Sequence, residues 1–346
     1  MKVLVLNNAA PFIRGGAEEL ADHLVARLNA IRGIEAELLR LPFKWYPAER
    51  LIEEVVLHRQ LKLTNVDRVI ALKFPAYLVP HKHKTLWLLH QFRQAYDLYR
   101  EGHTDIGFDE RGRQIVSAIK AADNRCFAES EAIYVNSPVT QKRLKTFNDV
   151  ESKVLYPPLN DPEHFSPASY GDYVFAGGRL SPAKRQHLLV EAMVDAPKGL
   201  RLVIAGPPDS PDYAKLLTDL VAKHDLGDRV DLRFGFRERE EIAELASNAL
   251  ACAYLPIDED SLGYVSMEAF GASKAVLTTD DSGGLLEIIH DGETGRVVKP
   301  EVAAISQALA SFWNDRARTE SMGRAGHTIL SAKKLTWADT IKRLLS

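Results

Sequence analysis

Two carboxylates stand eight positions apart in the stretch DSLGYVSME, residues 260–268. Ionised carboxylates are seldom buried without partners, and Glu268 lies close to the apolar face of a predicted helix. Glu268 therefore either contacts a ligand or is satisfied by neighbouring backbone or by a basic side chain. Asp260 either shares that ligand or serves as a loop or capping carboxylate.

Paired carboxylates can cleave a glycosidic bond, and their separation tests that idea. A retaining glycosidase holds its two carboxyl groups about 5–5.5 Å apart, and an inverting one about 6.5–9.5 Å apart. Eight residues of continuous helix span about 12 Å, although a bent loop would shorten this. The spacing argues weakly against hydrolysis and favours two acids that hold different hydroxyl-bearing parts of one extended ligand.

The two acids flank the predicted start of a helix. Residues 249–256 are typical of a strand, residues 257–261 of a loop, and a helix should begin near Gly263. The free amides of Gly263, Tyr264 and Val265 would then open the helix, and such amides bind anions together with the helix dipole. A ligand held in this order would have hydroxyl groups at each end and an anion between them. A nucleotide-diphosphate sugar has this outline, with sugar, phosphate and sugar in order.

A second motif, FAGGRLSPAKRQ over residues 175–186, places cations after a predicted strand. Gly178 allows a tight turn and a close backbone approach. Ser181 is the expected N-cap of the next helix, so Lys184 would lie in the first turn, where a cation is disfavoured unless an anion binds. Arg179 offers a planar fork suited to phosphate oxygens. The alternative is a solvated basic helix start; we favour an anion site.

Two further glycine pairs follow predicted strands. Gly15 and Gly16, in PFIRGGAEEL, would let backbone amides approach a phosphate, although a simple turn explains them equally well. The G-x-G-x-x-G spacing is missing, which disfavours a nicotinamide cofactor. Gly283 and Gly284, in DDSGGLLE, are expected to line the same site, with Glu287 in the first turn of a helix.

His90 follows the predicted strand 85–89 directly, at its carboxyl end, where ligands of α/β domains collect. Arg93, Tyr96 and Tyr99 follow it and could shape an acceptor pocket or simply pack. His90 itself is either a site residue or an ordinary loop histidine.

These motifs require parallel sheets to position them. Short apolar runs alternate with amphipathic helical patterns, which favours strands covered on both faces. The predicted strands cover residues 3–7, 36–41, 68–72, 85–89, 132–136, 153–156, 172–178, 200–206, 229–234, 249–255 and 275–279. A proline-rich segment, residues 156–167, breaks the alternation and is the expected linker.

We therefore predict an α/β protein with two Rossmann-like, doubly wound domains that face each other across a cleft. The first domain covers residues 1–160 and lies on the acceptor side, and the second covers residues 161–333 and binds the nucleotide sugar. Residues 334–346 form a closing helix that could pack back on the first domain. The cleft is the expected site.

Composition narrows the class of protein. The net charge of −3 disfavours a general nucleic-acid binder. Residues 1–160 hold 23 Lys+Arg and 19 Asp+Glu, a net charge of +4, which fits an anionic acceptor, a membrane surface or ordinary surface variation. The two cysteines are far apart in apolar contexts, as expected of free thiols in a reducing compartment. No apolar run reaches the ~20 residues of a membrane helix, and the start lacks the apolar core of a signal peptide.

Together these motifs resemble those of the retaining family 4 glycosyltransferases of GT-B fold. That family carries a Glu, seven residues, Glu signature, a following Gly-Gly-x-Pro-Glu turn, a Gly-Arg-x-x-x-x-Lys stretch and an N-terminal Gly-Gly loop. The corresponding stretches here are DSLGYVSME, DSGGLLE, GGRLSPAK and IRGGAEE. The resemblance is strong over residues 172–300 and diffuse over residues 40–130. Asp260 replaces the first signature Glu and is one methylene shorter, and Leu286 stands where proline is usual.

The resemblance implies roles for the matching residues. Arg179 and Lys184 would neutralise the donor diphosphate, Glu268 would hold the ribose hydroxyls, and Asp260 would contact the transferred sugar. His90 would contact a sugar hydroxyl. The candidate catalytic residues are therefore His90, Arg179, Lys184 and Asp260. The other expected donor-binding residues are Gly15, Gly16, Gly178, Leu262, Gly263, Tyr264 and Val265.

The implied activity is transfer of a sugar from a nucleotide-diphosphate sugar to an acceptor hydroxyl with retention of anomeric configuration, by front-face substitution. No metal and no cofactor is expected beyond the donor as co-substrate. The acceptor is a glycan, a glycolipid or a small molecule, as in surface polysaccharide or glycolipid synthesis. The alternatives are an epimerase or phosphorylase of the same fold, and a catalytically silent nucleotide-sugar-binding subunit. The expected location is the cytoplasm, with peripheral contact at the inner membrane face, and the oligomeric state is left open.

Overall fold

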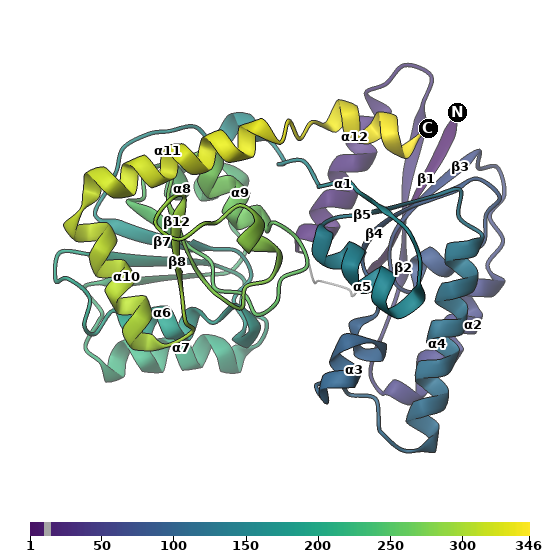
Figure 1. Cartoon of the computed structure of the whole chain (residues 1–346), viewed down its shortest axis with the longest axis horizontal. Coiled ribbons are helices and arrows are strands. Elements are labelled where there is room, and N and C mark those ends of the chain that lie inside the picture. The colour runs from purple at the N-terminus through teal and green to yellow at the C-terminus, as the bar shows by residue number, and fades with distance from the viewer. Residues whose placement is uncertain (10–14) are drawn as a thin grey trace. The chain divides into compact units, whose positions relative to one another are not determined.

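The structure is a computed structural model of the chain and describes residues 1–9 and 15–346. The chain divides into two compact units, each built on one six-stranded sheet (Figure 1). Unit 1 comprises Met1–Pro158 and Thr336–Ser346, and unit 2 comprises Leu159–Leu335. The first boundary falls inside the proline-rich segment that the sequence marks as a linker.

Unit 1 contains a wholly parallel sheet in the order β2-β1-β3-β4-β5-β6. Its strands are β1 (Lys2–Ala9), β2 (Glu35–Pro42), β3 (Arg68–Lys73), β4 (Lys84–His90), β5 (Ala132–Val135) and β6 (Lys153–Val154). Its helices are α1 (Gly16–Asn29), α2 (Leu51–Gln60), α3 (Asp97–Glu101), α4 (Glu110–Ala128), α5 (Pro138–Asn148) and α12 (Trp337–Leu344). The chain leaves β1 toward β2 and later returns to its other side, so the strand order reverses between β1 and β3.

Alternate residues of β3 enter two different cores, one on each face of the sheet. Val69 and Ala71 pack in the cluster that includes residues of α2 and α4. Ile70 and Leu72 pack in the cluster that includes residues of α1 and α12. A strand buried on both faces must be apolar at every position, which is why β3 has a continuous run and no polar alternation.

The last helix of the chain, α12, packs on α1 within unit 1. The Trp337 ring lies 6.4 Å from the His23 ring of α1 and 6.4 Å from the Trp87 ring of β4. Ile341 and Leu344 are buried in the same cluster. The C-terminal segment thus completes the core of the unit in which the chain begins.

Unit 2 contains a parallel sheet in the order β12-β11-β10-β7-β8-β9. Its strands are β7 (Tyr173–Gly177), β8 (Arg201–Gly206), β9 (Val230–Phe234), β10 (Ala251–Ala253), β11 (Val276–Thr279) and β12 (Gly295–Val298). Its helices are α6 (Gln186–Ala192), α7 (Pro211–Lys223), α8 (Arg239–Ser247), α9 (Tyr264–Gly271), α10 (Val302–Asn314) and α11 (Arg316–Ala332). None of the helices named for the two units is long and apolar enough to cross a membrane.

All eleven strands predicted from the sequence are present, and β12 is the one that the pattern missed. It is a four-residue edge strand that begins at a glycine. A Cβ atom at Gly295 would lie 2.0 Å from the carbonyl oxygen of Val276 on β11, so the glycine is required for the two strands to pair.

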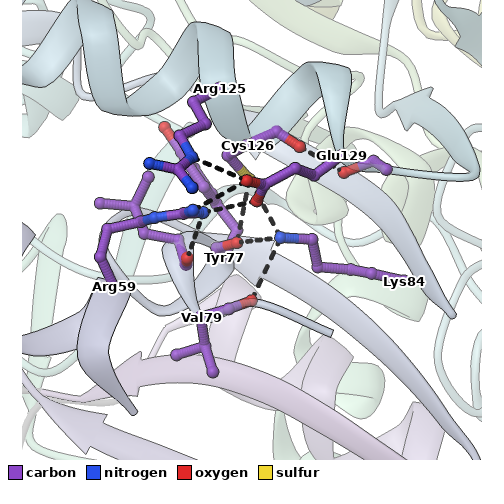
Figure 2. A network of polar contacts seen from close by, with 9 residues as sticks. Arg59, Tyr77, Val79, Lys84, Arg125, Cys126 and Glu129 are labelled. Carbon is purple, nitrogen blue, oxygen red and sulfur yellow. Dashed lines mark hydrogen bonds and ion pairs between the residues drawn. The ribbon is translucent and has the colours of Figure 1, made fainter. Parts of the chain in front are cut away.

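A fully buried lysine, Lys84, opens β4 (Figure 2). Its ammonium donates hydrogen bonds to the carbonyl oxygens of Tyr77 and Val79, both at 3.1 Å, and to the sulfur of Cys126 at 3.3 Å. Burial raises the pKa of the Cys126 thiol to about 11. A buried charge is costly without such partners, so Lys84 fixes the segment before β4 against α4.

An ion-pair group next to Lys84 joins α2 to the end of α4 (Figure 2). Arg59 donates to both carboxylate oxygens of Glu129, at 2.7 and 2.9 Å, and Arg125 donates to one of them at 2.8 Å. The hydrogen bonds from Arg59 lower the pKa of Glu129 from 4.5 to about 2. This bidentate pair should therefore stabilise the unit in a pH-dependent way.

Glu129→Gln should lower the free energy of unfolding at pH 7 by about 1 kcal/mol, a value reduced for the partial exposure of the pair. Because the folded pKa lies below the unfolded value, the contribution is present above pH 4.5 and is lost as the pH falls toward about 2. Urea denaturation followed by circular dichroism should show the two proteins converging over that range. A difference that stays constant down to pH 2 would contradict this account.

Candidate functional site

The candidate donor site lies at the carboxyl edge of the unit 2 sheet, where the strand order reverses between β7 and β10. The chain leaves β7 in one direction, toward β8, and continues on the other side of β7 from β10 onward. In open α/β sheets ligands bind outside the carboxyl ends of the strands at such a switch point. The loops that follow these strands, residues 178–185 and 254–263, carry most of the residues predicted from the sequence.

The loop after β7 turns sharply at Gly178, whose φ is +97°. A Cβ atom there would also lie 3.2 Å from the Val265 side chain, so this loop approaches the first turn of α9 closely. Arg179 follows, with a side chain that is 45% exposed and lies 3.3 Å from the carboxylate of Asp209. Its guanidinium is therefore at the surface of the switch point.

The predicted helix start at Ser181 is wrong in detail. Pro182–Lys184 form a single 3₁₀ turn, and α6 begins only at Gln186. Arg185 adopts a left-handed conformation with φ +55°, which interrupts the helix, and the Ser181 side chain makes no capping bond. Lys184 is therefore not in the first turn of an α-helix, and the dipole argument for its position does not apply.

Lys184 reaches across to the loop after β10. Its ammonium donates a hydrogen bond to the Tyr254 hydroxyl at 2.7 Å and forms an ion pair with Glu259. The Tyr254 hydroxyl donates to the same carboxylate at 2.8 Å. Burial, and then the charge of Glu259, hold the pKa of Tyr254 well above its usual value. Lys184, which is predicted to bind a diphosphate, is thus paired in this structure with Glu259, a residue that the sequence analysis does not identify.

The glycine turn after β11 supports the loop that carries the acids. The Asp258 amide donates to the Asp281 carbonyl oxygen at 2.9 Å, and the Gly284 amide donates to the Glu259 carbonyl oxygen at 2.8 Å. Gly283 has φ +67°, and a Cβ atom there would lie 2.5 Å from that Glu259 oxygen. The turn at Gly283 and Gly284, which is predicted to line the site, therefore fixes the backbone of Asp258 and Glu259. Asp260 follows directly and is half-buried.

Arg185 locks the three loops together and is only 7% exposed. Its guanidinium donates to the carbonyl oxygens of Leu255 and Pro256, at 2.8 and 2.9 Å, in the loop after β10. It also donates to the Thr279 hydroxyl at 2.7 Å and forms a bidentate pair with Asp281 at 2.7 and 2.8 Å, both around the end of β11. The pair with Arg185 lowers the pKa of Asp281. We call Arg185 with these four partners the Arg185 clamp.

The helix α9 opens as predicted from the spacing, with Gly263 before its first residue. Gly263 has φ +71°, and a Cβ atom there would lie 2.8 Å from the Tyr254 ring, so no larger residue fits. Leu262 is buried, and Tyr264 and Val265 form the first turn, whose amides have no intrahelical acceptor.

Glu268 is 7% exposed and forms an ion pair with Arg239 of α8. Arg239 also donates to the Asn160 carbonyl oxygen at 3.0 Å and stacks 4.5 Å from the Phe165 ring. Of the two possibilities considered for Glu268, a ligand or a basic side chain, the structure shows a basic side chain, that of Arg239. The buried hydroxyl of Ser266, on the same helix, and the buried side-chain amide of Asn160 have no hydrogen-bond partner among the described residues.

The remaining predicted residues belong to unit 1. His90 ends β4, is half-buried and has its Nδ1 2.7 Å from the Gln91 carbonyl oxygen. Gly15 precedes α1 and its carbonyl oxygen accepts the Glu18 and Glu19 amides, while Gly16 is the first residue of that helix. The rest of the predicted phosphate-approaching loop, residues 10–14, lies outside the described residues.

The residues proposed for an acceptor pocket separate into two groups. Tyr96 is buried and donates to the carboxylate of Asp123 at 2.7 Å, and Arg93 pairs with Asp97 at 2.7 Å. Both therefore pack in the unit. Tyr99 lines a cavity between α3 and α4.

Over residues 1–9 and 15–346, no three His, Cys, Asp or Glu side chains gather in a way that could hold a metal ion. Asp258 and Asp260, which have a D-x-D spacing in the loop after β10, are among the residues to which this applies.

Comparisons with known proteins bear on both units. The family model described as glycosyl transferases group 1 matches residues 162–328. Human alpha-1,3/1,6-mannosyltransferase ALG2 is 26% identical over 231 residues, which are 59% of this chain and 55% of that protein. Alpha-maltose-1-phosphate synthase of Mycolicibacterium smegmatis is 28% identical over 214 residues, 57% of this chain and 54% of that protein. The chain thus spans just over half the length of these relatives.

Among solved structures, Anabaena HepE in complex with UDP and glucose matches 99% of this chain and 98% of its own, with a TM-score of 0.72 and 17% identity. The predicted fold class is confirmed by this agreement over both units. The chain has the GT-B fold, and the part of it that resembles the glycosyl transferases group 1 model lies within unit 2.

Proposed function

We propose that this chain transfers a sugar from a nucleotide-diphosphate sugar to an acceptor hydroxyl with retention of anomeric configuration. The observation that carries the proposal is the position of Lys184, which meets Tyr254 and Glu259 at the switch point of unit 2, beside the loop that carries Asp260 and opens α9. The comparisons support it, since one relative is named a mannosyltransferase and HepE was solved with UDP and glucose.

The chemistry requires stabilisation of the negative charge that develops on the leaving diphosphate. Arg179 and Lys184 supply two cations on one loop, and the first amides of α9 supply a partial positive charge. Glu268 would accept the ribose hydroxyls, with the unpaired hydroxyl of Ser266 close to it in sequence on the same helix. Asp260 would contact the transferred sugar, and His90 and Gly16 would contribute from unit 1.

The finer assignments form part of the proposal. Transfer proceeds by front-face substitution, in which a phosphate oxygen of the donor helps to deprotonate the acceptor, and it needs neither a metal nor another cofactor. The acceptor is a glycan, a glycolipid or a small molecule of surface polysaccharide or glycolipid synthesis. The protein works in the cytoplasm, in peripheral contact with the inner membrane face.

The direct test incubates the purified chain with UDP-, GDP- and ADP-sugars and candidate acceptors, with and without EDTA. We expect nucleotide release, and a product whose anomeric configuration, determined by NMR, matches that of the donor. Arg179→Ala and Lys184→Ala should each lower the rate about 100-fold, because each removes a group that stabilises the leaving charge. Arg201→Ala breaks an exposed pair with Asp172 and serves as the control.

Other outcomes would favour the alternatives. Conversion of the donor into a different nucleotide sugar without acceptor would favour the epimerase. Binding of a nucleotide sugar without any turnover would favour the silent subunit. An inverted linkage would rule out the retaining mechanism while leaving transfer itself established.

Glu259 should compete with the donor diphosphate for Lys184, because one ammonium serves both. Glu259→Gln removes that charge and should tighten binding of nucleoside diphosphates by about fivefold, equivalent to about 1 kcal/mol for a partly exposed pair. Isothermal titration calorimetry with UDP, GDP and ADP measures the change. Asp231→Asn, which breaks the exposed pair with Arg233, should have no such effect. Weaker binding in Glu259→Gln would mean that Glu259 holds Lys184 in place and does not compete.

The Arg185 clamp should be needed for nucleotide affinity, although Arg185 itself is buried. Arg185→Met keeps an unbranched stem and removes the fork, and the loss of two or more hydrogen bonds of about 1 kcal/mol each should weaken nucleoside diphosphate binding about tenfold or more. Hydrogen–deuterium exchange should become faster over residues 254–262 and 280–284. Unchanged exchange there would show that other contacts hold the loops; Arg201→Ala is again the control.

A further inference from the structure

A cavity of about 440 Å³ is lined by residues of unit 1 only. Its walls come from α3 and α4, and its volume is in the range of small-molecule sites. The lining residues are Tyr99, Arg113, Val116, Ser117, Lys120, Ala121 and Asn124. They include two cations and three neutral polar groups, but no carboxylate.

Neither cation of this cavity has a carboxylate partner among the described residues. Arg113 makes one hydrogen bond, to the Phe108 carbonyl oxygen at 2.8 Å, and the Lys120 ammonium lies 5.3 Å from the centre of the Tyr96 ring. Arg59 in the same unit is instead fully paired with a carboxylate. Arg113 is exposed and Lys120 is half-buried, so water solvates both charges in the absence of a ligand. Together they make the cavity wall positive, which suits an anionic ligand.

The cavity is linked to the end of β4 by a short chain of side-chain amides. The Gln91 amide donates to the Asn148 oxygen, and the Asn148 amide donates to the Asn124 oxygen at 2.5 Å. Gln91 directly follows His90, the residue expected beside the transferred sugar. A ligand anchored in the cavity is therefore one intervening side chain away from the segment that carries His90.

We propose that this cavity binds the phosphate of a phosphorylated acceptor. That the ligand is an acceptor rests on the proposed transferase function. That the ligand carries a phosphate rests on the cavity alone. The planar fork of Arg113 and the point charge of Lys120 match a phosphate, which carries more charge than a carboxylate and has more acceptor oxygens. Ser117 and Asn124 can donate to its remaining oxygens, and Tyr99 offers a ring face to an attached sugar.

The test measures binding of glucose 1-phosphate by calorimetry. It uses the full chain carrying Arg179→Ala and Lys184→Ala, so that unit 2 does not take up the probe. In that background, Arg113→Gln with Lys120→Gln should weaken binding about tenfold or more, because two charge-assisted contacts are lost. Arg111→Gln with Lys142→Gln changes the net charge equally at two exposed residues outside the cavity lining and should leave binding within about twofold.

Vesicles identify the source of the phosphate. Cavity-dependent binding to phosphatidic acid vesicles, but not to glucose 1-phosphate or to phosphatidylcholine vesicles, would place the phosphate on a lipid-linked acceptor. Cavity-dependent binding of glucose 1-phosphate would place it on a soluble one. Equal losses in the two double variants, or no binding of either probe, would overturn the inference. Binding of nucleoside diphosphate by the unsubstituted chain is measured in parallel, so that failure of the cavity and failure of the transferase proposal give different results.

Discussion

The guanidinium of Arg185 is the contact on which the arrangement of the candidate donor site depends. The loops that it joins follow β7, β10 and β11, and they are separated by whole crossover units in the sequence. A buried guanidinium is tolerated only when its donors are paired, and here the partners are backbone carbonyls, a hydroxyl and one carboxylate. Any other path for these loops would leave a buried charge without partners, so the clamp selects one geometry for the backbone that carries Glu259 and Asp260.

Two lysines of this chain illustrate the difference between a structural and a chemically available charge. Lys84 is fully buried at the start of β4, and its hydrogen bonds go to backbone oxygens and a thiol that cannot move independently. Lys184 is partly exposed beyond the end of β7, and its partners are the side chains of Tyr254 and Glu259. Side chains at a loop can exchange partners when a ligand arrives, whereas buried backbone oxygens cannot be replaced without unfolding the unit.

The parts of the molecule that the sequence predicts well are those governed by local pattern. Continuous apolar runs such as that of β3 mark buried parallel strands, and Gly263 marks the opening of α9 because its conformation excludes a side chain. The 3₁₀ turn at Pro182–Lys184 escaped prediction because it depends on the left-handed Arg185, which distant partners impose. The Arg239 partner of Glu268 lies 29 positions away, on another helix, and no spacing rule connects them. Glu259 was visible beside Asp260, but its partner Lys184 comes from a different loop.

The balance of charge at the switch point has a consequence for which ligands it can accept. Lys184 faces Glu259, and Arg179 lies near Asp209, so each predicted phosphate-binding cation already has one carboxylate close to it. A ligand must offer each cation at least as much negative charge as the carboxylate that it displaces, because the Coulomb energy scales with the product of the charges. A diphosphate has enough charge and enough oxygens to bind both cations at once. A monophosphate can displace one of the two carboxylates, but the other cation then stays paired with its own carboxylate. Under the proposed function, the acidic partners would favour a nucleoside diphosphate over a nucleoside monophosphate, because a weakly charged ligand gains less than the carboxylate that it displaces.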